Sequence, residues 1–278
     1  HGLPDEGGEY TRGTPNVWSN TAYDPVLNLV YAPTGNSSPD YFDGTLRSKE
    51  AEENASSVVA IDAATGERRW VYQTVHRDIW DWDVPAAPLL IDLPSGRKVV
   101  MSVTKQAFVY AFDRLTGEPI WPIEELPVPA GDVPNEWYSL TQPFPTRPAP
   151  FDRQGFTEDD LIDFTPQLRA MALEAVAGFR LSPSLYSPPS LTEAPDGTRG
   201  LLSLPSSTGG ANWEGSAIDP ETGILYIPSR TQLQTLSLAK NPISDIDLSQ
   251  TVGVRVPRVE GLEVVKPPYG RVTAIDMN

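Results

Sequence analysis

Eight consecutive residues, HRDIWDWD at positions 76–83, combine three aspartates, a histidine and two tryptophans. An exposed acidic loop has no use for Trp80 and Trp82, and a buried core does not hold three unpaired carboxylates. Two interpretations are open. The segment is either a corner in which the acids pair with cations, or a metal or proton-transfer site. Taken alone, the segment favours the ion-pair corner.

The proton-transfer interpretation centres on Asp81, which lies between the two tryptophans. A carboxylate within hydrogen-bond reach of an alcohol can take the hydroxyl proton while hydride leaves the carbon. Flanking indole rings would exclude water, and a nearby metal ion would keep the acid ionised. A glycoside hydrolase using Asp81 and Asp83 is a weaker third interpretation, because acids this close in the chain form a poor pair for that reaction.

The elements that must position this segment are predicted to be short β-strands. Six stretches are β-branched or aromatic and are bounded by turn residues: NLVYAPTG, SVVAID, KVVMSVT, AFVYAFD, ILYIPS and RVTAID. The motif A-x-D-x-x-T-G-x-x-x-W occurs at residues 60–70 and 111–121, and its first residues recur at 274–278. Its Asp and Thr-Gly suit a turn between strands, and its Trp can lie flat between neighbouring sheets.

A second repeat, W-x5-D-P-x5-Y, occurs at residues 18–31 and again at 213–226. Each copy predicts a strand, a turn and a second strand. Units of about four short strands repeated every 40–50 residues are typical of β-propeller blades. The sequence therefore predicts an all-β fold made of propeller blades, with residues 1–278 forming one partial propeller domain.

One part of the chain breaks this pattern, and we predict an insertion at about residues 122–205. Its first part, 122–150, is rich in proline. Residues 165–178 predict a short helix that Thr165 caps and Gly178 ends. Its expected apolar stripe comprises Leu168, Met171 with Ala172, and Val176.

Composition excludes several function classes. The formal net charge is −16, which argues against nucleic acid and anionic membranes as partners. The chain has no cysteine, so disulfides, thiolate metal sites and cysteine nucleophiles are excluded within it. An oxidising compartment is compatible with this composition.

The repeats, together with TVHRDIWDWDVPAAP at 74–88, make the sequence similar to a known family. It resembles the quinoprotein dehydrogenases that use pyrroloquinoline quinone (PQQ), in particular their membrane glucose and quinate dehydrogenase branch. The resemblance begins at about residue 13 and is strongest over 13–121. It implies part of an eight-bladed propeller whose remaining blades lie outside this chain, and a location in the periplasm, with membrane association through segments absent here.

The resemblance also implies roles for five residues. Trp18 matches the tryptophan under the PQQ ring, and Asn36 matches an asparagine ligand of Ca²⁺. Asp81 matches the catalytic base, which also lies beside the metal. Lys105 matches the cation that bonds the quinone oxygens. Asp83 matches an extra acid of glucose-type enzymes and lanthanide-dependent relatives, which leaves the choice between Ca²⁺ and a lanthanide open.

The expected function is oxidation of a sugar, cyclitol or other alcohol, with electrons passed to a quinone or cytochrome. A non-catalytic propeller that scaffolds protein partners is the alternative, and it has no need of Asn36, Asp81 and Lys105. The sequence departs from the family at IPSR, where Pro228 and Ser229 replace an expected asparagine. A glutamate metal ligand of the family has no counterpart in this chain.

Overall fold

The fold is described from a computed structural model of the chain. The structure describes residues 15–44, 47–93, 96–242, 246–251 and 253–278. Residues 13–14, where the expected resemblance begins, lie outside this part. No helix within it is long and apolar enough to cross a bilayer.

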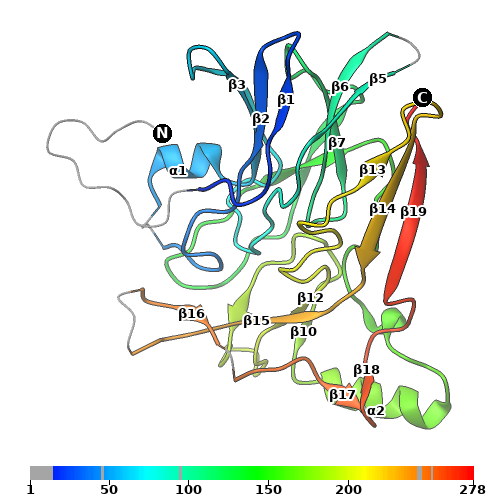
Figure 1. The fold of residues 1–278 in the computed structure, drawn as a ribbon. Coiled ribbons are helices and arrows are strands. Elements are labelled where there is room, and N and C mark those ends of the chain that lie inside the picture. Colours follow the sequence, from blue (N-terminus) through cyan, green and yellow to red (C-terminus); the bar gives the residue numbers. More distant parts are fainter. Residues whose placement is uncertain (1–14, 45–46, 94–95, 243–245, 252) are drawn as a thin grey trace, which may run out of the picture.

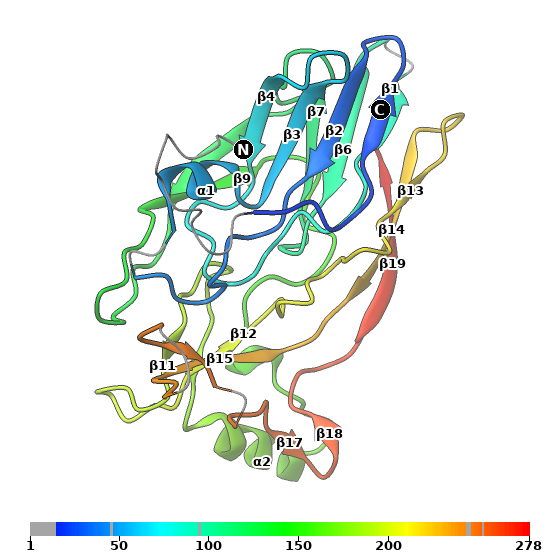
Figure 2. The same cartoon turned by 60° about the vertical axis from the view of Figure 1, so that its left-hand side comes forward.

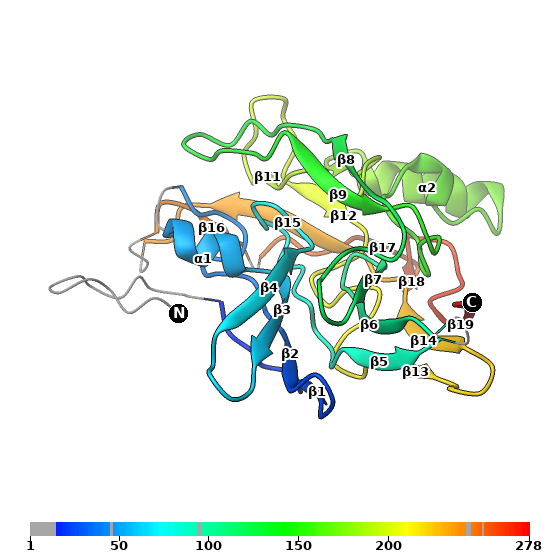
Figure 3. The ribbon, with the colours of Figure 1, turned by 90° about the horizontal axis from the view of Figure 1, so that it is seen from above.

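Three antiparallel sheets lie in the upper part and along the right side of Figure 1, and the first two consist of consecutive strands. The first contains β1 (Ala22–Asp24), β2 (Leu29–Pro33), β3 (Ser57–Asp62) and β4 (Arg68–Gln73), in that order. The second contains β5 (Leu89–Asp92), β6 (Lys98–Val103) and β7 (Val109–Asp113), and the third contains β13 (Ala217–Ile218), β14 (Ile224–Arg230) and β19 (Gly270–Asp276). All six stretches expected to form strands do so. Strand β5 contacts both β1 and β13, so the sheets lie side by side, as Figure 3 shows from above.

The turns within these sheets are built alike. The Asp62 carboxylate accepts hydrogen bonds from the backbone N–H of Ala64 and Thr65, and Asp113 does the same for Leu115 and Thr116. Asp24 accepts from Val26 and Leu27. The residue closing each turn has a positive φ: 76° at Gly66, 75° at Gly117 and 55° at Asn28. Glycine and asparagine are the residues that adopt this conformation most readily.

The predicted packing of a motif tryptophan between sheets is confirmed for Trp70. Its indole Nε1 donates to the backbone oxygen of Arg114 at 3.1 Å. A Cβ built on Gly117 would lie 2.6 Å from the Trp70 ring, so the ring rests on that glycine. Arg114 reaches back to Asp24 of the first sheet at 3.0 Å. One tryptophan and one arginine thus join the first sheet to the second.

In chain order, the remaining elements lie between β7 and β13 or after β14, apart from a short helix described below. They are β8 (Ile123–Pro127), β9 (Thr141–Pro145), η1 (Glu158–Asp160), α2 (Pro166–Val176), β10 (Arg180–Leu181), β11 (Ser190–Leu191), β12 (Leu201–Ser203), β15 (Gln234–Ala239), β16 (Ser249–Gln250), β17 (Arg258–Val259) and β18 (Leu262–Glu263). In Figure 2, α2, β17 and β18 lie at the end of the molecule farthest from β1 and β2. Because β12 pairs with β15, one extra sheet uses strands on both sides of residue 205. The insertion at about 122–205 stays a prediction.

The two helices differ in how well the sequence predicts them. Thr165 caps α2 as expected, by accepting a hydrogen bond from the Leu168 N–H. The expected stripe is wrong at Met171, which is 39% exposed, because Ala172 and Val176 are the residues that α2 buries. The short helix α1 (Lys49–Asn54) was not predicted. Six residues are too few for a helical apolar period to be visible in the sequence.

Candidate active site

The segment 76–83 is organised by Asp78, which is 1% exposed. Its Oδ1 accepts from the Trp80 N–H at 3.0 Å, and its Oδ2 accepts from the Trp82 N–H at 2.8 Å. The Ser56 hydroxyl also donates to Oδ2, at 2.6 Å. Burial raises the pKa of Asp78 to about 6, although these hydrogen bonds favour the ionised form. Asp78 therefore fixes the backbone that carries its neighbours.

The two tryptophans of the segment form an apolar wall. Their rings stack with centroids 5.2 Å apart and planes inclined by 12°. Tyr186 meets both rings edge-on, at 5.5 Å from Trp80 and 5.6 Å from Trp82. All three are buried and belong to the core cluster that the first two sheets share. This wall keeps water from one side of the loop.

Asp81 lies at the edge of this wall with its side chain 25% exposed. Its backbone has a φ of 61°, a left-handed conformation that is uncommon for a residue other than glycine. Such conformations concentrate at functional sites, where the surrounding structure holds them. The Asp81 carboxylate is therefore held at a partly accessible position at the edge of the packed loop.

Lys105, from the turn between β6 and β7, lies opposite Asp81. Its Nζ donates to the Asp81 backbone oxygen at 2.9 Å and approaches Asp81 Oδ1 at 3.2 Å. The same Nζ pairs with Asp83 Oδ2 at 2.5 Å. Lys105 is 4% exposed and Asp83 is 7% exposed. One buried ammonium group therefore holds two carboxylates that lie two residues apart.

Trp18 and Asn36 complete the cluster from the other side. The backbone N–H of Asn36 donates to Asp83 Oδ1. A Cβ on Gly35 would come within 2.9 Å of Asp83 and 3.1 Å of the Trp18 ring, so these groups close around a residue that must be small. The Lys105 Nζ lies 6.0 Å from the centroid of Trp18, and Trp18 is 45% exposed. The structure thus brings together all five residues that the sequence singles out.

The charges in this cluster do not balance. Burial raises the pKa of Asp81 to about 8, because the nearby Lys105 only partly offsets burial and the charges of Asp83, Asp40 and Asp78. Burial lowers the pKa of Lys105, but Asp83 and Asp81 outweigh it and the net direction is upward. Lys105 is therefore cationic at neutral pH. With a pKa of about 8, Asp81 is mostly protonated at neutral pH, and an additional cation beside it would keep it ionised.

The donor set fits a hard metal ion in chemistry and in charge. Carboxylates and an amide oxygen are ligands that Ca²⁺ accepts. The Asn36 side-chain oxygen also accepts from the Ser37 N–H at 2.8 Å, while its Nδ2 donates to the backbone oxygens of Asp40 and Asp78. Within the described ranges, no three His, Cys, Asp or Glu side chains gather closely enough to hold an ion by themselves.

Two residues near the site were missed in the sequence. Buried Arg77, the second residue of the segment, pairs with Asp43 at 2.7 Å and with Glu136 at 2.5 Å. These ion pairs use acids outside the segment, whereas Asp81 and Asp83 of the segment itself pair with Lys105. Glu136 is 59 residues from Arg77 along the chain, so no local pattern indicates the pair. The second missed residue is Tyr41, whose hydroxyl lies 3.4 Å from Asp81 Oδ2.

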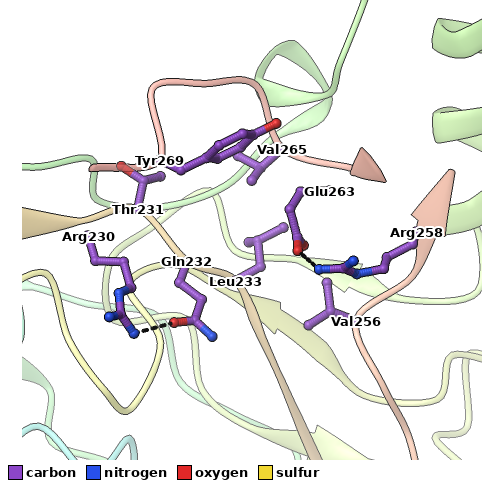
Figure 4. Close-up of a pocket in the computed structure, with 9 residues that line it drawn as sticks. All are labelled: Arg230, Thr231, Gln232, Leu233, Val256, Arg258, Glu263, Val265 and Tyr269. Carbon is purple, nitrogen blue, oxygen red and sulfur yellow. Dashed lines mark hydrogen bonds and ion pairs between the residues drawn. The ribbon is translucent and has the colours of Figure 1, made fainter. Parts of the chain in front are cut away.

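The other residues that the sequence analysis considered for the site lie outside the cluster. His76 contacts Gln73 at 2.7 Å and Glu125 at 3.0 Å, away from the cluster. Pro228 and Ser229 lie within β14, opposite β19. A separate pocket has a volume of about 510 Å³, and Figure 4 shows the residues that line it. It is lined by Arg230, Thr231, Gln232, Leu233, Val256, Arg258, Glu263, Val265 and Tyr269, and none of the five cluster residues lines it.

Comparison with known proteins gives the chain its relatives. Residues 1–278 match the sequence profile of the family "PQQ: Glucose/ethanol/alcohol dehydrogenase, beta-propeller domain". Quinate/shikimate dehydrogenase (quinone) of Acinetobacter baylyi is 33% identical over 96% of this chain and 35% of that protein. The glycerol dehydrogenase large subunit of Gluconobacter oxydans is 34% identical over 100% of this chain and 40% of that protein.

Among solved structures, the quinohemoprotein alcohol dehydrogenase of Pseudomonas putida HK5 is similar. It is 27% identical, with a TM-score of 0.51, and the match covers 84% of this chain and 28% of that one. The chain spans little more than a third of the length of the curated relatives. The expected all-β propeller fold is confirmed.

Proposed function

This chain belongs to the PQQ-dependent glucose, ethanol and alcohol dehydrogenase family with a β-propeller domain, and on that premise we propose that it forms part of an alcohol-oxidising active site. The substrate is a sugar, cyclitol or other alcohol, and the electrons pass to a quinone or cytochrome. The observation that carries this proposal is the joint position of Trp18, Asp81 and Lys105 in one partly exposed cluster. The alternative, a scaffold without catalysis, has no need of that cluster.

In this proposal Trp18 supplies an exposed aromatic face on which a flat cofactor can stack. Lys105 supplies a permanent positive charge beside that face, which stabilises negative charge as the cofactor is reduced. The chemistry that bound PQQ contributes is acceptance of hydride at its quinone. The chain's own part is to bind, to orient and to move a proton.

Asp81 is the group that takes the proton of the substrate hydroxyl. Its Oδ1 is held by Lys105, so the carboxylate plane is fixed before substrate binds. Trp80 and Trp82 exclude water behind it. A proton accepted there can leave to solvent, because the Asp81 side chain is partly exposed.

A divalent or lanthanide ion would be held on this chain by Asn36, Asp81 and Asp83, and it would act as a Lewis acid. The acid surplus around Asp81 supports this assignment. We also place the protein in the periplasm, as in the family it resembles. The greater length of its relatives supports the proposal that further blades complete the site.

The test is reconstitution of the intact protein with PQQ and Ca²⁺, and in parallel with PQQ and La³⁺. Reduction of an artificial electron-acceptor dye is then followed with glucose, quinate, glycerol and ethanol. Turnover with at least one alcohol, dependent on both PQQ and metal, is expected. An absence of both PQQ binding and turnover would favour the scaffold.

A further inference from the structure

Tyr41 is held beside Asp81 by contacts on both sides of its backbone. The Asn36 amide donates to the backbone oxygen of Asp40 at 3.2 Å, and the Arg47 guanidinium donates to that of Pro39. On the other side, the Asp43 N–H donates to Glu136 at 2.8 Å. The Tyr41 ring also packs against two apolar clusters, so its hydroxyl has a defined position.

The two oxygens of Asp81 face different groups. Lys105 lies 3.2 Å from Oδ1, whereas the Tyr41 hydroxyl lies 3.4 Å from Oδ2. Burial, followed by the charge of Asp81, raises the pKa of Tyr41, so its hydroxyl stays protonated. The Ser207 side chain also hydrogen-bonds to the Tyr41 hydroxyl. A separation of 3.4 Å is longer than the usual 2.7–2.8 Å of an O–H···O bond. A substrate hydroxyl can therefore replace the long contact between Tyr41 and Asp81 while Ser207 stays bonded to Tyr41.

We infer that Tyr41 is a substrate-positioning residue that selects alcohols with a second hydroxyl on the adjacent carbon. Asp81 Oδ2 accepts from the reacting hydroxyl, and the Tyr41 hydroxyl donates to the neighbouring one. Two oxygens on adjacent carbons are separated by a distance comparable to the 3.4 Å between these protein atoms. Tyr41 and Asp81 are both partly exposed, so a substrate can reach them. The inference rests on the proposed function.

The experiment compares 1,2-propanediol with 1-propanol, which lacks only the adjacent hydroxyl. Wild type and Tyr41→Phe are loaded with PQQ and Ca²⁺, and kcat and KM are measured for both substrates. Loss of one hydrogen bond should lower kcat/KM of Tyr41→Phe for the diol about tenfold, and that for 1-propanol about twofold or less. Tyr23→Phe is the matched control, because it removes a surface hydroxyl that donates to Asn28 at 3.0 Å.

An equal loss for both substrates would overturn the inference, because it would mean that Tyr41 only supports Asp81. If Tyr41→Phe does not fold, the test is the kcat/KM of wild type for the two substrates. A value for 1,2-propanediol no higher than that for 1-propanol overturns the inference, and a clearly higher value supports it. A wild type that oxidises no alcohol in the wider panel would overturn the proposed function and, with it, this inference. A wild type that oxidises alcohols without diol preference would leave the proposed function standing.

Discussion

At the scale of single residues, the site depends on a carboxylate whose charge its surroundings do not fully compensate. The Asp81 backbone has a φ of 61°, and the contact with Lys105 holds its partly exposed carboxylate in place. The sequence could predict Asp81, Lys105 and Asp83 because a family motif contains them. It could not predict Tyr41, which lies 40 residues from Asp81, or the ion pairs of Arg77, whose partners lie 34 and 59 residues away.

Replacement of Asp81 by asparagine should separate proton transfer from cofactor binding. The amide keeps the shape and one oxygen but does not accept a proton. We expect kcat to fall by about 10²–10⁴-fold, the usual contribution of a general base, while PQQ stays bound. Steady-state kinetics and the absorbance of bound PQQ measure the two effects. Asp163→Asn, on an exposed loop, is the control. Activity within a few-fold of wild type would show that Asp81 is not the base, and loss of the fold would favour the ion-pair corner.

Replacement of Asp83 by alanine tests the metal assignment. The change removes one carboxylate from the donor set and leaves Lys105 paired with Asp81. Binding of Ca²⁺ and La³⁺ to the PQQ-free protein should weaken, and La³⁺ should be affected more because it carries the higher charge. Calorimetric titration with each ion measures this. Unchanged affinities would assign Asp83 to a structural ion pair.

At the scale of elements, the turn and the docking tryptophan were predictable because both are encoded within eleven residues. The extra sheet of β10, β12, β15, β11 and β16 was not predictable. Its strands are two to six residues long, and β10 pairs in parallel with β12. So short a strand shows no alternation, and its register depends on partners that are distant in sequence. Met171 illustrates the same limit, since its exposure depends on which side of α2 is covered by segments distant in sequence, such as β17.

A comparison of two glycines isolates the contribution of Trp70 packing to the free energy of unfolding. Gly66 and Gly117 have φ values of 76° and 75° in equivalent turns, but only Gly117 lies under Trp70. Alanine at either position should lower the free energy of unfolding by about 1–2 kcal/mol through the left-handed backbone. Gly117→Ala should lower it by about 1–3 kcal/mol more, because the new methyl group displaces Trp70. Urea unfolding of both variants measures the difference. Equal losses would mean that the ring moves aside freely.

At the scale of the whole molecule, the net charge is −16, and we expect the free energy of unfolding to depend on pH. Burial alone would raise the pKa of Asp24, but hydrogen bonds from Leu27, Arg114 and Val26 outweigh it, so its pKa is lowered. A carboxyl group with a lowered folded-state pKa contributes stability above its unfolded value of about 3.9. That contribution is lost as the pH falls through the folded value.

Wild type should therefore lose stability as the pH falls below about 4, and Asp24→Asn should lose less over the same interval. Urea unfolding at pH 6 and pH 3 compares each protein with itself. At pH 6 the variant should be the less stable of the two, because Arg114 loses a buried partner. A variant with the same pH dependence as wild type would show that Asp24 does not contribute to acid sensitivity.

The contact of Trp70 with Gly117, which connects the first two sheets, forms only after both residues have been synthesised. Trp70 is synthesised 47 residues before Gly117, on which its ring rests. At about 5–20 residues per second, the indole waits roughly two to nine seconds for its partner. During that interval the nascent chain presents an uncovered aromatic surface to the cell, and that surface is available to a chaperone until the second sheet arrives.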